Sequence, residues 1–221
     1  HADVPVAALL SPAHADALRA QIRRDRRLEP LSPIPLPAHT DTVYIAVVDK
    51  DRNAASFINS LFSSFGTGLM APRSGVLLHN RGASFVVERG HPNCIAPGKR
   101  PLHTIIPGMA VRDRRLVMPF GVMGGQYQAM GHAWFLANLL DFGLDLQEAI
   151  DLPRLFPTLA GPVEIESGIP AATVAALKRL GHSPVRPDRP IGGGQAIWID
   201  WKSGVLTGAS DPRKDGLALG Y

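Results

Sequence analysis

Thr42 carries a hydroxyl that could act as a nucleophile, and it is the first residue of a strand-like apolar run, Thr42-Val-Tyr-Ile-Ala-Val-Val-Asp49. A threonine hydroxyl is a weak nucleophile at neutral pH and needs a base. When threonine is the first residue of a chain, its own α-amine, with a pKa of about 8, can take the proton. That chemistry requires a cut between Asp41 and Thr42. On the local sequence alone, the simpler interpretation is a β-branched residue that opens a strand.

A second chemical feature is the glycine pair Gly124-Gly125, between a predicted strand and a predicted helix. Acyl transfer places negative charge on a carbonyl oxygen, and backbone N–H groups aimed at that oxygen stabilise it. Two glycines present such donors without side-chain obstruction, and the N-terminus of the following helix adds its dipole. Paired glycines also make ordinary tight turns, so the pair by itself leaves both interpretations open.

The elements that must position these residues follow from the apolar pattern. Residues 43–48 have no polar group except a tyrosine hydroxyl, which predicts a strand buried on both faces. Residues 54–60 predict its partner in a hairpin. Residues 115–122 predict a further strand, in which Pro119 indicates an edge or a bulge. The other expected elements are a loop at 61–75, a short strand at 76–78, helices at 126–142 (ended by Gly143), 146–154 and 170–180, and paired strands at 195–201 and 205–209.

The segment before Thr42 has a different character. Ser11 and Pro12 predict the N-cap and the first position of a helix over residues 12–27. Four prolines in residues 29–37 exclude a helix or a central strand. We therefore expect an extended linker there, of the kind found at domain and processing boundaries.

Composition limits the classes of function. A chain of 221 residues, 45% hydrophobic and 19% charged, predicts a soluble globular protein with one core, or with one core plus an appendage. No apolar run approaches the roughly 20 residues of a membrane helix. The net charge of +4 comes partly from arginines between residues 19 and 27. No aromatic residues accompany them, as single-stranded nucleic acid would require, so we expect no nucleic acid partner. The first residue is His1, which leaves the compartment, periplasmic or cytoplasmic, undetermined.

Other motifs carry less weight. Gly66-Thr-Gly-Leu-Met-Ala71 matches a dinucleotide-binding pattern, but Pro72 prevents the helix that such a site needs. The eight histidines include no H-x-x-x-H pair, so we expect no metal site. Cys94, the single cysteine, is interpreted as a loop residue rather than a catalytic thiol. We expect no cofactor.

Taken in order, four segments resemble the small subunit of the gamma-glutamyltransferase family: the Thr42 strand, Pro97-Gly-Lys-Arg-Pro-Leu102, Gly121-Val-Met-Gly-Gly125 and Gly208-Ala-Ser-Asp-Pro-Arg213. The resemblance rests on their order and spacing over residues 42–221. It implies an N-terminal-nucleophile hydrolase that cuts its own precursor between Asp41 and Thr42. Residues 1–41 are then the tail of a large subunit, and residues 42–221 the small catalytic subunit.

The resemblance also implies a fold and a set of roles. Pattern alone predicts a mixed α and β chain; the resemblance makes it an α+β fold, part of a four-layer αββα sandwich that this chain only partly supplies. Thr42 is the nucleophile, Ser60 contacts its hydroxyl, and Gly124 and Gly125 form the oxyanion hole. The residues implied to shape the substrate pocket are Asn80, Arg81, Ser84, His103 and Thr104.

Two positions depart from the family pattern. Ser84 stands where the family has an aspartate that grips the substrate's α-ammonium, and Phe62 stands where it has an asparagine. A neutral serine cannot offer the charge-assisted contact that an ammonium group favours. The sequence therefore is similar to the acylase-like branch of the family, related to glutaryl-cephalosporin acylases.

The expected activity is acyl transfer from a γ-glutamyl (glutathione-like) or glutaryl-type amide to Thr42, and then to water or an amine. The expected partners are the large subunit and a small-molecule amide, and a higher oligomer is left open. Two alternatives remain: an unprocessed or inactive scaffold in which the Asp41–Thr42 bond persists, and an amidohydrolase of non-glutamyl amides.

Overall fold

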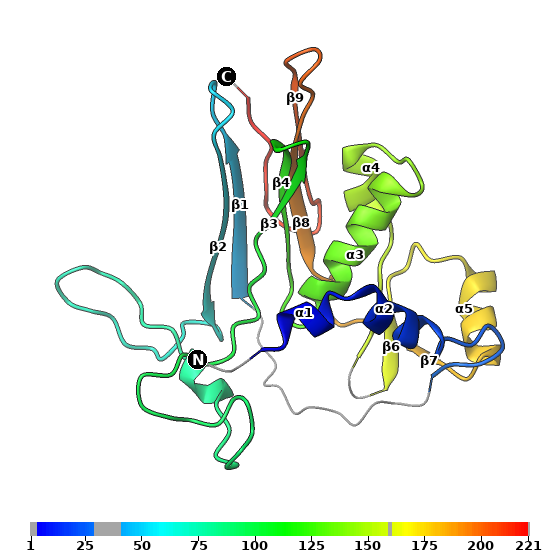
Figure 1. Cartoon of the computed structure of the whole chain (residues 1–221), viewed down its shortest axis with the longest axis horizontal. Coiled ribbons are helices and arrows are strands. Elements are labelled where there is room, and N and C mark those ends of the chain that lie inside the picture. The colour runs from blue at the N-terminus through cyan, green and yellow to red at the C-terminus, as the bar shows by residue number, and fades with distance from the viewer. Residues whose placement is uncertain (1–3, 29–40, 159–160, 221) are drawn as a thin grey trace. The chain divides into compact units, whose positions relative to one another are not determined.

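The computed structural model describes residues 4–28, 41–158 and 161–220, and in it Thr42 lies in the first strand of a hairpin. β1 (Asp41–Val48) pairs antiparallel with β2 (Ala54–Phe62). The turn between them is held by the Asp49 carboxylate, which accepts the N–H groups of Asp51 and Asn53. The predicted hairpin is confirmed (Figure 1).

The prediction that β1 is buried on both faces is wrong. Tyr44 is 1% exposed, whereas Val43, Ile45 and Val47 are 56%, 45% and 49% exposed. Alternation of this kind is the pattern of a strand covered on one face. The run of apolar residues concealed it because both faces of β1 carry apolar side chains.

The chain divides into two compact units, and β1 and β2 belong to the second, which comprises residues 38–81, 103–153 and 188–221. This unit also contains a four-stranded antiparallel sheet in the order β3-β4-β8-β9. β1 packs against β4 and β8. Figure 1 shows the hairpin on one side of this sheet and two helices on the other. The strands of the larger sheet are β3 (Gly108–Arg112), β4 (Arg115–Met123), β8 (Gly193–Ile199) and β9 (Leu206–Ser210).

Two helices close the core of the second unit. α3 (Tyr127–Leu140) begins one residue after and ends two residues before the bounds of the predicted helix at 126–142. α4 (Leu146–Asp151) begins where the predicted helix at 146–154 begins but ends three residues early. α4 begins with a capping box, in which Asp145 and Glu148 satisfy each other's backbone N–H groups. The core between helices and sheet consists of Met118, Phe120, Phe135, Leu146, Ala149, Ile150, Ala196 and Ala209.

Pro119 does not mark an edge strand, because β4 lies between β3 and β8. A bulge lies nearby but not at the proline itself: the β3–β4 register shifts between Ala110, which faces Met118, and Val111, which faces Leu116, so the extra residue is Val117. Pro119 pairs with Met109 of β3, and the β4–β8 register begins only at Phe120, so on the β8 side the proline lies at the end of the ladder, where a missing N–H is tolerated.

The first unit comprises residues 1–37, 82–102 and 154–187. Its helix α2 (Pro12–Arg19) is capped by the Ser11 side chain, as predicted, but ends eight residues before residue 27. Beyond it, the Arg27 N–H donates to the Leu180 carbonyl at 2.8 Å. The predicted linker at 29–37 lies outside the described residues. The other elements are α1 (Val6–Leu9), α5 (Ala171–Arg179) and a sheet of β5 (Leu155–Pro157), β6 (Pro162–Ile165) and β7 (Ser183–Val185).

The chain is thus a mixed α and β protein, as predicted. Within the second unit the described residues form a hairpin, a sheet and a helical layer, in that order. In the described segments, no helix is both long and apolar enough to cross a lipid bilayer.

Candidate active site

The structure brings the hydroxyl groups of Thr42 and Ser60 together. Thr42 Oγ1 donates to Ser60 Oγ at 3.3 Å. The strand register shifts at this point, since Asp41 faces Phe62 while Val43 faces Asn59. One residue of β1 therefore lies opposite two of β2, which is a β-bulge, a feature that commonly re-aims a side chain.

Phe62, at the end of the bulge, has an unusual backbone. Its φ is +80°, a left-handed conformation that costs a non-glycine residue energy, and its side chain is only 2% exposed. Its N–H donates to Ser60 Oγ at 3.1 Å. The serine that contacts Thr42 is thus fixed from two sides. Phe62 itself is the last residue of β2 rather than part of the following loop.

The glycine pair lies at the same end of the second unit. β1 begins there, and β4 ends there before it turns into α3 (Figure 1). Met123, the last residue of β4, is in a buried cluster with Tyr44 and Ile58 of the hairpin. The predicted nucleophile and the predicted oxyanion donors therefore share one end of the packed sheets.

Both glycines adopt conformations that favour glycine. The φ angles of Gly124 and Gly125 are +127° and +61°. Their carbonyls accept the first N–H groups of α3, from Tyr127 at 3.0 Å and Gln128 at 3.2 Å. The pair forms a turn that directs the chain from β4 into the N-terminus of α3.

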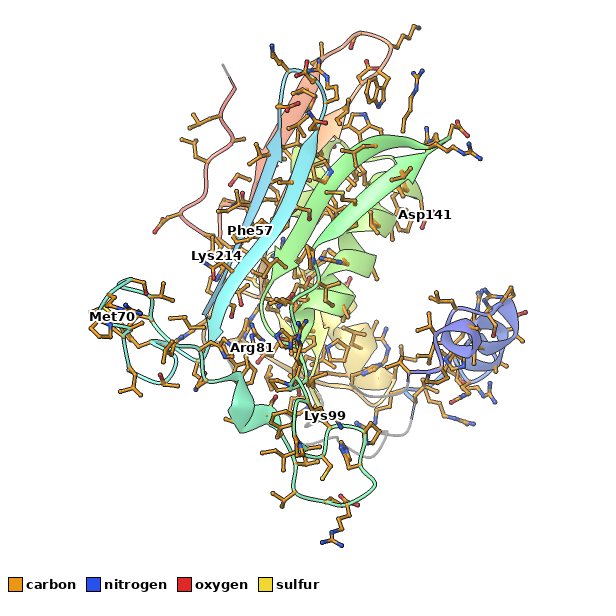
Figure 2. All side chains as sticks on the ribbon, turned by 60° about the vertical axis from the view of Figure 1, so that its left-hand side comes forward. Phe57, Met70, Arg81, Lys99, Asp141 and Lys214 are labelled. Carbon is orange, nitrogen blue, oxygen red and sulfur yellow. The ribbon has the colours of Figure 1, made fainter. Side chains whose placement is uncertain are left out.

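Asn80 and Arg81 lie beside the end of β2. The Asn80 N–H donates to the Leu61 carbonyl at 3.1 Å, and its Oδ1 accepts the Ser63 N–H at 3.0 Å. Arg81 is 2% exposed, and its guanidinium carbon lies 5.3 Å from the centre of the Phe62 ring. Burial lowers the pKa of the Arg81 guanidinium below its ordinary value. Figure 2 shows Arg81 next to the lower end of the hairpin.

His103 and Thr104 belong to an irregular segment of the second unit. Two residues anchor that segment: Ile105 packs on the Tyr44–Met123 cluster, and the Ile106 N–H donates to Gln128 Oε1 at 3.1 Å. Since Gln128 is in the first turn of α3, this predicted pair is held close to the glycine turn.

Ser84 belongs to the first unit, unlike the other predicted site residues. It ends the short 3₁₀ helix η1 (Arg81–Ser84) and is 6% exposed. Its carbonyl accepts Asn93 Nδ2 at 2.6 Å. These contacts fix its own surroundings within that unit.

Two polar residues near the glycine turn were not among the predicted site residues. His132 Nε2 accepts the Val122 N–H at 3.0 Å, which links α3 to β4 two residues before Gly124. Burial lowers the pKa of His132, so the imidazole is neutral at pH 7. Asp211, 1% exposed, accepts the Gly194 N–H at 2.7 Å. The unbroken run Gly192-Gly193-Gly194 was the signal that could have pointed to this region.

Tyr44 does not supply a general base. Burial raises the pKa of its hydroxyl to about 12. The hydrogen bond with Ser56 Oγ, at 2.8 Å, lowers this pKa, but by less than burial raises it. Among the described residues, no three His, Cys, Asp or Glu side chains gather where they could hold a metal ion.

Comparison with known proteins identifies the relatives of this chain. A model of the family described as gamma-glutamyltranspeptidase matches residues 1–221. The chain is 34% identical over 230 residues to the glutathione hydrolase-like YwrD proenzyme of Bacillus subtilis (strain 168). The alignment covers 99% of this chain and 42% of that protein.

Solved structures show the same relationship. The cephalosporin acylase from Bacillus halodurans has a TM-score of 0.86 and 40% identity, over 97% of this chain and 39% of that one. The gamma-glutamyltranspeptidase from Pseudomonas nitroreducens complexed with L-DON has a TM-score of 0.72 and 28% identity, over 80% of this chain and 98% of that one.

The match to the curated relative spans about two fifths of its length. It nevertheless includes almost every residue of this chain, and the family match extends over the whole sequence. The chain belongs to the gamma-glutamyltranspeptidase family.

Proposed function

We propose that this chain is part of an N-terminal-nucleophile amidase that works through an acyl-threonine intermediate. The observation that carries the proposal is the contact between Thr42 Oγ1 and Ser60 Oγ at the β-bulge. It supports a nucleophilic hydroxyl held at a strand end, beside the turn that offers Gly124 and Gly125 as donors.

The proposed reaction has two steps. The α-amine of Thr42 takes the proton from its own hydroxyl as Oγ1 attacks the amide carbonyl. The backbone N–H groups of Gly124 and Gly125 stabilise the resulting oxyanion. The carbon–nitrogen bond then breaks, the amine leaves with the proton, and an ester to Thr42 remains. Water or another amine attacks that ester and releases the acyl group.

The free α-amine requires cleavage between Asp41 and Thr42. We propose that residues 1–41 end a large subunit and that residues 42–221 form the small subunit. Residues 42–221 make up about four fifths of the chain, and the Pseudomonas nitroreducens chain matches 80% of this chain with 98% of its own length. A separate chain of that extent is what cleavage before Thr42 would produce.

The large subunit is the partner that we propose for the exposed face of the β1–β2 hairpin. Five apolar side chains lie on this face without a charge among them: Val43, Ile45, Val47, Ala55 and Phe57. A relative more than twice as long as this chain supplies the length needed to cover it. A helical layer there would complete the four-layer αββα sandwich, because the described layers already run hairpin, sheet, helices.

The proposed substrate is a γ-glutamyl or glutaryl-type amide. Asn80, Arg81, Ser84, His103 and Thr104 are the residues that we propose to shape the acyl pocket. Ser84 supplies no negative charge for an α-ammonium group, which favours a glutaryl chain over a γ-glutamyl chain.

The decisive experiment follows the full-length precursor by intact mass and N-terminal sequencing. We expect two fragments, the smaller beginning at Thr42, and turnover of glutaryl or γ-glutamyl p-nitroanilide. Thr42→Ala should stay a single chain without turnover, whereas Thr207→Ala, an exposed threonine of β9, should split as the parent does. A Thr42→Ala protein that still splits at this bond would refute the assignment.

A further inference from the structure

The backbone of Gly192 lies directly against the glycine turn. A Cβ on Gly124 would lie 2.7 Å from Gly192 Cα. In the reverse direction, a Cβ on Gly192 would lie 2.7 Å from the Met123 carbonyl oxygen and 2.5 Å from Tyr127 Cδ1. Real Cβ atoms essentially never approach other atoms this closely, so any side chain at Gly192 must displace the turn or the Tyr127 ring. The φ of Gly192, +63°, also favours glycine.

The Tyr127 ring is enclosed on a second side as well. A Cβ on Gly131 would lie 2.7 Å from Tyr127 Cε1 and 2.7 Å from Val122 Cγ1. Tyr127 itself is 2% exposed. A ring held between two glycines in a buried site has little room to move aside, because protein interiors are close-packed. Displacement by a side chain at Gly192 would therefore pass into the backbone of the turn.

The loop that contains Gly192 is fixed by Asp211. Gly193 and Gly194 begin β8 and pair with Met123 and Val122 of β4. The Gly194 N–H donates to Asp211 Oδ2 at 2.7 Å, and the Asp211 N–H donates to the Gly194 carbonyl at 3.0 Å. This two-way link ties the chain just after β9 to the start of β8, two residues beyond the point of contact with the turn.

Asp211 is in turn held by Arg213. Arg213 Nη1 lies 3.2 Å from Asp211 Oδ1 and 3.2 Å from the Ile150 carbonyl, and Nη2 lies 2.9 Å from the Leu152 carbonyl. The two side chains are 12% and 0% exposed. A buried ion pair adds little net stability, since desolvation offsets much of its attraction, but these bonds fix where the Asp211 carboxylate lies. The connection runs from the end of α4 through Arg213, Asp211 and Gly194 to the turn.

We infer that Gly192 and Asp211 are positioning residues for the oxyanion donors: they fix the backbone of the Gly124–Gly125 turn without touching substrate. The inference rests on the proposed role of that turn. Oxyanion stabilisation depends on donors that are already in place when charge develops, and a misplacement of about 1 Å can cost about a hundredfold in rate. Substrate affinity depends on other residues and is expected to change little.

The test compares Gly192→Ala with Gly204→Ala in the full-length protein. Gly204, in the β8–β9 turn, has a similar φ of +77°, and the nearest atom to a Cβ there is Arg52 Nη2 at 3.9 Å. Both substitutions strain the backbone, but only the first disturbs the glycine turn. For the cleaved enzyme, we expect Gly192→Ala to lower kcat at least about tenfold with KM within about twofold, and Gly204→Ala to keep the parent kcat.

Asp211→Asn provides a second, independent variant, which keeps the shape of the side chain but weakens its hold on Gly194. It should lower kcat in the same way and leave KM unchanged. If Gly192→Ala does not fold or is not cleaved before Thr42, the kinetics of Asp211→Asn alone test the inference. Parent-like kcat in a folded, cleaved Gly192→Ala or Asp211→Asn enzyme overturns the inference, as does a rise in KM alone. Absence of Thr42-dependent turnover in the parent instead refutes the proposed function.

Discussion

The Thr42 hydroxyl donates to a neighbouring hydroxyl, that of Ser60. Ser60 Oγ accepts from Thr42 Oγ1 and also from the Phe62 N–H, so it cannot turn freely away. The φ of Phe62, +80°, is a strained value for a residue other than glycine. Strain of this kind persists only where the surrounding structure over-determines it, and it is commonly found at functional sites.

Replacing Ser60 by alanine should slow the reaction moderately. One neutral hydrogen bond contributes about 0.5–1.5 kcal/mol, so we expect kcat to fall roughly threefold to tenfold. Ser56→Ala is the matched control, because Ser56 lies on the same strand but bonds to the Tyr44 hydroxyl instead. Steady-state kinetics of the cleaved enzymes measures both. Equal kcat in the Ser60→Ala and Ser56→Ala enzymes would show that the hydrogen bond from Thr42 to Ser60 does not contribute to the reaction.

Introducing a carboxylate at position 84 should change substrate choice. Ser84→Asp offers a charge-assisted partner to an α-ammonium group, worth about 1.5–3 kcal/mol. We expect the ratio of kcat/KM for γ-glutamyl over glutaryl p-nitroanilide to rise by roughly tenfold to a hundredfold. Ser74→Asp, in an exposed loop, should leave the ratio unchanged. A parent enzyme that already favours the γ-glutamyl substrate strongly, and does not respond to Ser84→Asp, would contradict the proposed pocket.

Residue types and order were sufficient to predict the Thr42–Ser60 contact, because the resemblance preserves their spacing. The contacts of Gly192 and Asp211 could not be predicted in this way. Gly192 meets Gly124 across 68 positions of sequence, and a contact between two backbones leaves no trace in apolar periodicity.

Among the elements, β4 and α3 matter most for the site, and His132 joins them. Its Nε2 accepts the Val122 N–H only when that nitrogen is unprotonated. Burial lowers the pKa of His132 in the folded protein, whereas the unfolded chain protonates it near its ordinary value of 6.5. The unfolded state therefore binds the proton more readily.

It follows that the stabilising effect of His132 is complete above about pH 6.5 and is lost as the pH falls from there towards the lowered pKa of the folded state. In His132→Gln, the side-chain carbonyl can accept the same N–H without titrating. We expect the thermal midpoint of this variant to fall less between pH 7.5 and pH 5 than that of the parent. His182→Gln serves as the control and should follow the parent. Identical slopes for His132→Gln and the parent would exclude the link.

The long elements were predictable and the short ones were not. The hairpin follows from two apolar runs on either side of a polar turn at residues 49–53, and α3 follows from an apolar pattern between Gly125 and Gly143. β5 and β7 have only three residues each, and both contain a proline, so no period could emerge from them. The prediction that both faces of β1 are buried was wrong because the sequence of β1 is apolar on both faces. Apolar residues on both faces indicate that both faces will be covered, and within the described chain only one is.

At the scale of the whole molecule, the uncovered face of the hairpin is the surface that we propose the large subunit covers. Ile45 and Phe57 are register partners at its centre and are 45% and 52% exposed. If the large subunit packs there, a charge at Ile45 must be buried without a partner, which is costly. We expect Ile45→Lys to reduce co-elution of the two fragments in size-exclusion chromatography, or to prevent accumulation of soluble precursor.

The matched control for this surface is Val205→Lys. Val205 is 55% exposed and lies in the turn between β8 and β9, outside the hairpin. It should assemble as the parent does. Undiminished co-elution of the Ile45→Lys fragments would show that the large subunit covers a different surface.

The pairing of β1 with β2 also bears on what happens to a chain end created at Thr42. New termini usually fray, because a residue gains about 1–2 kcal/mol of conformational entropy when its backbone is released. Here the residue that follows immediately, Val43, is already fixed opposite Asn59, and the ladder continues to Val48. A cut before Thr42 would therefore yield an N-terminal amine with little conformational freedom. The effective local concentration of the base next to its hydroxyl would be set by the hairpin before any substrate arrives.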